Sequence, residues 1–163
     1  MKKWAGVLLV FLLLLGATAS AAVQIGDRAE DFSIVNSDGT VSTLSLMLAQ
    51  KKAVYVYFWA SWGDMSREEL PVVQAMYDQY GGDCGFIVAS VEAEDNVSTV
   101  EALKQTLGLT TLPMGTGGLD AFLAYEQPGI PFSVLIDADG TVRAMHLGVA
   151  TAEGRLDALD DIR

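Results

Sequence analysis

Two stretches of the chain are apolar at nearly every position, which is typical of strands covered on both faces of a sheet. The first is AVYVYFWA, residues 53–60, and the second begins CGFIVAS, residues 84–90. Between them, apolar side chains recur at three-to-four spacing, which predicts an amphipathic helix. The apolar face of this helix consists of Leu70, Val73, Met76, Tyr77 and Tyr80. Because a helix joins the two strands, we expect them to be parallel.

The start of this helix has polar residues at the spacing of a capping box. Ser66 and Glu69 are three residues apart, so we predict that Ser66 is the N-cap. Asp64 would add a negative charge beside the positive end of the helix. Pro71 lies near the start and predicts a kink, whereas Gly81 and the glycine after it predict the end.

Alternating apolar and polar residues precede the first apolar strand. They flank Asp38-Gly39, and this arrangement predicts a β-hairpin. The side chains expected to face the core are Phe32, Ile34, Val41 and Leu44.

The second half of the chain predicts shorter elements. Ser98 and Glu101 have capping-box spacing and would open a helix that ends at about Leu107. The later segments predict a loop over 108–118, a helix over 119–126, a strand–turn–strand unit over 130–148 and a last helix over 151–163 capped by Thr151. Because the central strands are apolar on both faces, this order predicts an α/β fold of three layers, helix, sheet and helix.

The first residues have the pattern of a secretory signal. Lys2 and Lys3 precede an apolar run over 7–15, and small residues follow in the order that signal peptidases cleave. We therefore predict a signal peptide over 1–21, a single domain over 22–163, and a periplasmic or secreted protein. The alternative is an uncleaved segment that anchors the protein to the outer face of the inner membrane.

Charge and composition exclude several classes of function. The chain has 10 basic and 21 acidic residues, a net charge of -11, which disfavours binding to nucleic acid. His146 is the only histidine, and one histidine without cysteine neighbours does not predict a metal site. Nothing in the sequence indicates a cofactor.

Cys84 is the only cysteine, so the chain forms no internal disulfide. It begins the second apolar strand, whereas the turn after residue 60 follows the first. In parallel strands of this length those two points are about 20 Å apart. We expect a packing thiol, and the alternatives are a redox sensor or pairing between molecules.

Three blocks of residues resemble one known family. VYVYFWASWGDMSREELP is similar to the active-site segment of thioredoxins, in the form FWASWCxPCRxExP of the exported TlpA/ResA-like thiol-disulfide oxidoreductases. QIGDRAEDFSI followed by DGTVSTLSL looks like their N-terminal hairpin extension. GIPFSVLIDADGTV is similar to their segment G-x-P-x-x-x-x-I-D-x-D-G. This resemblance implies a thioredoxin fold with a central mixed sheet and an N-terminal β-hairpin.

The resemblance also implies the place of the site. Pro131 would follow a cis peptide bond, and Trp62 would flank the active-site turn. Gly63 stands where the family has its attacking cysteine, and Ser66 where it has the resolving one. Tyr57 stands where thioredoxins have a buried aspartate.

These departures remove the chemistry of the family. Thiol-disulfide exchange needs a thiolate, and the turn Trp62-Gly63-Asp64-Met65-Ser66 contains no sulfur nucleophile. A catalytic pair of Ser66 with His146 is an alternative that nothing in the sequence orients. Peroxiredoxins share a similar hairpin but need a cysteine at their own turn. We therefore predict no catalytic residue in this turn.

Binding of other proteins does not require sulfur. In the family, the backbone before the cis proline pairs with an extended partner chain, and Ile130 and Pro131 would retain this ability. Trp62 and Met65 would form an apolar rim. We expect protein or extended peptide partners in the cell envelope and a redox-inactive, chaperone-like or accessory role. The alternatives are a groove without function, and a thiol-disulfide oxidoreductase that uses Cys84 or another mechanism.

Overall fold

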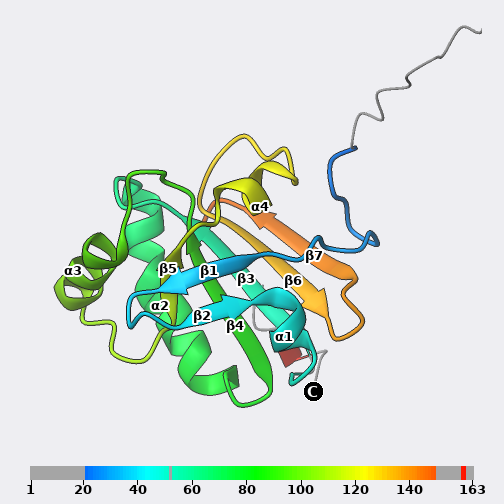
Figure 1. Cartoon of the computed structure of the whole chain (residues 1–163), viewed down its shortest axis with the longest axis horizontal. Helices are drawn as coiled ribbons and strands as arrows, with labels where there is room; N and C mark the ends of the chain where they lie inside the picture. The colour runs from blue at the N-terminus through cyan, green and yellow to red at the C-terminus, as the bar shows by residue number, and fades with distance from the viewer. Residues whose placement is uncertain (1–20, 52, 150–158, 161–163) are drawn as a thin grey trace, which may run out of the picture.

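The computed structural model describes residues 21–51, 53–149 and 159–160. In chain order the elements are β1 (Ser33–Asn36), β2 (Val41–Thr43), α1 (Leu44–Leu48), β3 (Ala53–Trp59), α2 (Asp64–Tyr80), β4 (Cys84–Ser90), α3 (Val97–Leu107), β5 (Met114–Thr116), α4 (Leu119–Leu123), β6 (Phe132–Asp137) and β7 (Val142–Leu147). The strands form one sheet in the order β2-β1-β5-β4-β3-β6-β7, with helices packed around it (Figure 1).

The sheet is mixed, as the resemblance implied. β3 and β4 are parallel, and their register runs from Ala53 opposite Cys84 to Trp59 opposite Ser90. β5 is also parallel to β4, whereas β6 pairs antiparallel with β3 on its other side. Strand β3 therefore lies inside the sheet, and all seven of its residues are buried because both faces of the sheet are covered.

Successive residues of β3 point to opposite faces of the sheet, and each face has its own core. Tyr55, Tyr57 and Trp59 pack on the face covered by α2 and α3. Val54, Val56 and Phe58 pack on the other face, against α1, α4 and the segment before β1. The predicted order of helix, sheet and helix is confirmed.

The N-terminal hairpin is confirmed, with one side chain in the other orientation. β1 and β2 pair antiparallel, and Gly39 turns the chain with φ of +83°. Ile34 and Leu44 are buried and Phe32 is half-buried. Val41 was expected in the core, but it is 62% exposed. It lies on β2, which is an edge strand, so its outward face has no element to cover it.

Two elements were absent from the sequence prediction. α1 follows β2 directly, and β5 lies inside the segment 108–118 that we expected to be a loop. β5 has only three residues, and it fits between β1 and β4. Gly115 makes this possible, because a Cβ there would lie 2.3 Å from the carbonyl oxygen of Val35 in β1.

The predicted cap of α3 was wrong by two residues. Asn96 is the N-cap, and its side-chain oxygen accepts hydrogen bonds from the backbone N–H groups of Ser98 and Thr99. Ser98 lies inside the helix and is exposed. Asparagine is as good an N-cap as serine, so Asn96 takes the role by position.

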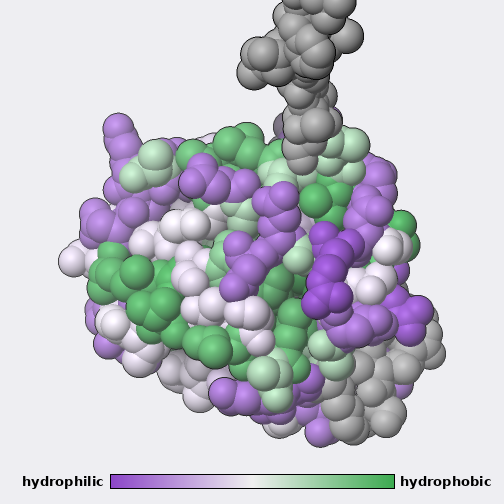
Figure 2. All heavy atoms as spheres, turned by 45° about the vertical axis from the view of Figure 1, so that its right-hand side comes forward, coloured by the Kyte–Doolittle hydropathy of each residue, from purple (hydrophilic) through white to green (hydrophobic). Residues whose placement is uncertain are grey.

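The described surface mixes polar and apolar groups, and Figure 2 shows hydrophobic patches separated by hydrophilic side chains on one face. Within residues 21–51, 53–149 and 159–160, no helix is long and apolar enough to span a bilayer. The predicted signal peptide lies outside these residues except for Ala21, and so does Thr151.

Candidate functional site

The turn between β3 and α2 is held by backbone hydrogen bonds. The N–H of Gly63 donates to the carbonyl of Ala60 at 3.1 Å, and the N–H of Arg67 donates to the carbonyl of Gly63 at 3.0 Å. α2 begins at Asp64, with Gly63 as the N-cap residue. Asp64 lies in the first turn of the helix, where its charge complements the helix dipole.

Ser66 is not the N-cap that the capping-box spacing predicted. It lies in the first turn of α2, fully buried, and its hydroxyl oxygen has no hydrogen-bond partner among the described residues. Its Oγ is 3.0 Å from the point where a Cβ on Gly63 would stand. The two positions that resemble the family's cysteine sites therefore face each other.

Glu69 is the buried acid of the site, and its partner was not predicted from the sequence. The hydroxyl of Tyr57 donates a hydrogen bond of 2.8 Å to Oε2 of Glu69. The same hydroxyl lies 3.4 Å from the carbonyl oxygen of Ser66. One signal could have revealed this burial: Ser66 and Glu69 continue the stripe of Val73 and Met76 at helical spacing.

The loop before β6 reaches the turn from the other side. The peptide bond between Ile130 and Pro131 is cis. Cδ1 of Ile130 is 3.3 Å from the position of a Cβ on Gly63, so this side chain lies over the turn. The carbonyl of Pro131 accepts a hydrogen bond of 2.8 Å from the N–H of Gly148, which fastens the loop to the end of β7.

Trp62 and Met65 are exposed beside this loop, at 65% and 50%. With Ile130, which is half-buried, and Pro131, which is buried, they form what we call the docking surface. Trp62 is also held in place, because its indole N–H donates a hydrogen bond of 2.6 Å to Oε2 of Glu92.

The segment that follows β4 connects to the turn through two carboxylates. Glu92 accepts the indole N–H of Trp62, and this hydrogen bond lowers the pKa of Glu92. Asp95 is buried and accepts hydrogen bonds from the Ser90 hydroxyl and from the N–H of Ser61. These bonds fix the turn relative to the end of β4.

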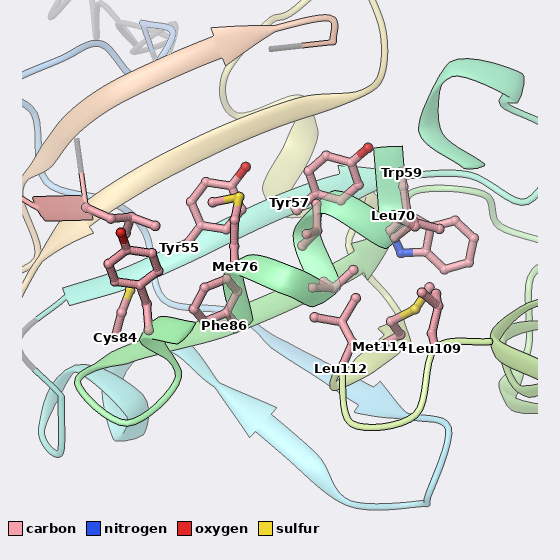
Figure 3. Packing of buried hydrophobic residues seen from close by; sticks show 14 of the residues in the cluster. Tyr55, Tyr57, Trp59, Leu70, Met76, Cys84, Phe86, Leu109, Leu112 and Met114 are labelled. Atoms are coloured by element: carbon pink, nitrogen blue, oxygen red, sulfur yellow. The ribbon is translucent and has the colours of Figure 1, made fainter. Parts of the chain in front are cut away.

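Cys84 lies far from the turn. It is the first residue of β4, paired with Ala53 at the start of β3, whereas the turn follows Trp59 at the opposite end. Figure 3 shows Cys84 and Trp59 at opposite ends of the same buried cluster. Cys84 is 4% exposed, and burial raises the pKa of its thiol to about 11. Both its position and its protonation oppose a role at the turn.

The remaining candidates do not form a site. His146 is exposed on β7, and Ser66 is buried on α2, so the structure does not join them as a catalytic pair. In the part of the chain that the structure describes, no group of three or more His, Cys, Asp or Glu side chains is arranged to hold a metal ion.

Comparisons with known proteins agree with this architecture. The thioredoxin-like protein YneN of Bacillus subtilis is 28% identical over 173 residues, which cover 98% of each chain. Thiol-disulfide oxidoreductase ResA of Geobacillus thermodenitrificans is 28% identical over 165 residues, covering 96% of this chain and 92% of that protein. The crystal structure of a thio-disulfide isomerase from Thermus thermophilus matches with a TM-score of 0.69 at 25% identity, over 86% of this chain and 97% of the other.

The resemblance seen in three blocks of sequence is therefore confirmed over most of the chain. The fold is that of the thioredoxin-like thiol-disulfide oxidoreductases. The sequence model of the AhpC/TSA family matches residues 25–154. The chain belongs to the AhpC/TSA family.

Proposed function

We propose that this protein is a redox-inactive thioredoxin-fold protein of the cell envelope that binds extended segments of other proteins at the docking surface. One observation carries the proposal. Gly63 and Ser66 occupy the two facing positions of the turn, and neither supplies a thiol.

The absence of dithiol chemistry follows from what the reaction needs. Exchange proceeds by attack of a thiolate on a disulfide and requires a second thiol to resolve the mixed disulfide. A buried hydroxyl such as that of Ser66 does not replace a thiolate in this reaction. Cys84 is the only thiol of the chain, and a pKa of about 11 keeps it protonated at neutral pH.

The geometry of the docking surface suits an extended partner. The cis peptide bond between Ile130 and Pro131 lies beside the turn, and a partner chain would pair there with the backbone of Ile130 as an added strand. Trp62 and Met65 offer apolar area to the partner's side chains, and such exposed pairs are typical of recognition surfaces. Because the hydrogen bond to Glu92 already holds the Trp62 side chain in place, binding would cost less side-chain entropy.

The proposed location rests on the first residues of the sequence. Their order of basic residues, apolar run and small residues is that of an export signal. The partners would then be proteins of the cell envelope.

The similarity to thiol-disulfide oxidoreductase ResA favours a second candidate, an oxidoreductase; because Cys84 is the only cysteine, such an enzyme would have to use it between molecules. An insulin-reduction assay on the purified domain separates the two candidates. We expect no turnover from the wild type or from Cys84→Ala. Turnover by the wild type that disappears in Cys84→Ala would overturn the redox-inactive assignment.

The binding role is tested by crosslinked pull-down from the envelope fraction of the native host. We expect Trp62→Ala to lose partners that the wild type recovers. The matched control is Leu46→Ala, because Leu46 is also 65% exposed but lies on α1. Equal recovery by the wild type and Trp62→Ala would contradict the proposal.

A further inference from the structure

The indole N–H of Trp62 donates a hydrogen bond to a carboxylate. Oε2 of Glu92 accepts the indole N–H, and Oε1 of the same side chain accepts the backbone N–H of Glu94 at 3.2 Å. Both bonds stabilise the ionised form of Glu92, and its pKa is lowered chiefly by Trp62. A negative charge is therefore fixed beside an aromatic ring that remains 65% exposed.

The surroundings of Trp62 carry an excess of negative charge. Asp64 and Glu68 are exposed in the first turn and a half of α2, and Glu94 is exposed on the segment after β4. The segment 91–96 contains no basic residue, and Arg67 is the only cation on α2. The charged groups that neighbour Trp62 along the chain, and those joined to it through Glu92, are therefore mainly acidic.

A buried polar atom lies at the base of this surface. The Ser66 hydroxyl is fully buried, has no hydrogen-bond partner among the described residues, and lies 3.0 Å from the point where a Cβ on Gly63 would stand. The Cδ1 methyl of Ile130, a residue of the docking surface, lies 3.3 Å from the same point. A docked backbone that displaces this methyl gives the hydroxyl a partner, and buried polar groups normally have one.

From these observations, and resting on the proposed docking function, we infer that the surface selects extended segments that carry lysine or arginine. The cation stacks on the exposed face of Trp62, where the ring quadrupole attracts it. Its charge is paired with the fixed carboxylate of Glu92. The apolar part of the same side chain covers Met65. The chemical class of the partner is a basic, extended polypeptide.

Three labelled peptides test the inference. They share one unstructured sequence of serine, threonine and valine and differ only in two positions, which are lysine, glutamine or glutamate. Binding to the purified domain is measured by fluorescence anisotropy at low and at high salt. We expect the lysine peptide to bind at least about 3-fold tighter than the glutamine peptide at low salt, and the glutamate peptide to bind weakest. The preference should shrink at high salt.

Variants assign the preference to the two residues. Glu92→Gln keeps an acceptor for the indole but removes the charge. It should therefore weaken binding of the lysine peptide about 2- to 5-fold and leave binding of the glutamine peptide unchanged. Trp62→Leu keeps an apolar side chain without the aromatic face, and it should also reduce the lysine preference. Asp139→Asn removes one charge from the turn between β6 and β7, at the far end of the sheet, and should change nothing.

The outcomes separate this inference from the proposed function. If the three peptides bind equally and Trp62→Ala weakens all of them, the surface docks extended chains without a preference for cations, and the inference is wrong. If Glu92→Gln and Asp139→Asn reduce the preference alike, net charge explains it and the inference is also wrong. Failure of all three peptides to bind would overturn both proposals.

Discussion

Oγ of Ser66 lies 3.0 Å from the point where a Cβ on Gly63 would stand. In a disulfide, the Cβ of one cysteine and the sulfur of the other are separated by about 3 Å, as the bond lengths and angles of the bridge require. The turn therefore keeps the spacing of a redox site although both sulfur atoms are missing.

The first prediction follows from this spacing. In a Cys84→Ala background, the double variant Gly63→Cys and Ser66→Cys should form an intramolecular disulfide on mild oxidation. Mass spectrometry would detect the loss of two hydrogens, and the insulin assay would show whether exchange activity appears. Position 66 is fully buried whereas position 63 is only half-buried, so the new thiol at 66 would be shielded and the one at 63 more accessible.

A matched pair tests whether geometry, and not mere proximity, decides the outcome. In Gly63→Cys with Met65→Cys the second side chain would take the place of one that is 50% exposed. Side chains two residues apart at a helix start do not face each other, so this pair should stay reduced. A folded double variant at 63 and 66 that resists oxidation would contradict the prediction.

The second prediction concerns the bond between Tyr57 and Glu69. Tyr57→Phe removes a buried hydrogen bond to a carboxyl group and should lower the free energy of unfolding by about 1–3 kcal/mol. Urea unfolding followed by circular dichroism measures the change. The ring itself is retained, so the loss belongs to the hydroxyl.

Tyr77→Phe provides the control. Tyr77 is only partly buried, and its ring packs edge-on against Phe86, a contact that phenylalanine keeps. We expect a change of less than about 0.5 kcal/mol. Equal losses in the two variants would show that the Tyr57 hydroxyl has no particular role.

The sequence predicted the fold well because the central strands leave little choice. Residues 53–59 are apolar on both faces, and this pattern fits only a strand with cover on each side. The helix after the turn was equally clear from its apolar face. The ends of elements were harder to predict, since Met114–Thr116 is too short to show a period and contains a glycine.

The error at Ser66 has a specific physical origin. A capping box and a buried helical stripe both place residues three apart, so Ser66 and Glu69 fit either pattern. The buried stripe prevails because Tyr57 supplies a donor to Glu69 from the neighbouring strand. That partner is twelve residues away along the chain, so local spacing could not reveal it.

The third prediction tests the corrected cap of α3. Asn96→Ala removes the acceptor for the backbone N–H groups of Ser98 and Thr99, and should destabilise the protein by about 1 kcal/mol. Ser98→Ala changes an exposed residue inside the helix and should be nearly neutral. Thermal or urea unfolding compares the two. A larger loss from Ser98→Ala would restore the capping box as the better description.

The fourth prediction concerns the pH range over which Cys84 makes the folded protein less stable. Burial raises the pKa of its thiol from 9.0 to about 11 in the folded protein. A group whose pKa is higher when folded contributes stability that is fully present below its unfolded pKa and is lost as the pH rises through the folded one. A shift of this size corresponds to about 2–3 kcal/mol. Stability should therefore fall between pH 9 and 11.

Comparison with Cys84→Ala isolates the contribution of the thiol. Burial also raises the pKa of Tyr125, to about 12, but this group is common to both proteins and cancels in the difference. Urea unfolding in reducing buffer at several pH values across this window should show a steeper loss of stability for the wild type than for the variant. Parallel curves would mean that the thiol ionises as easily in the folded chain as in the unfolded one. Cys84 would then be open to the reactive role that its burial argues against.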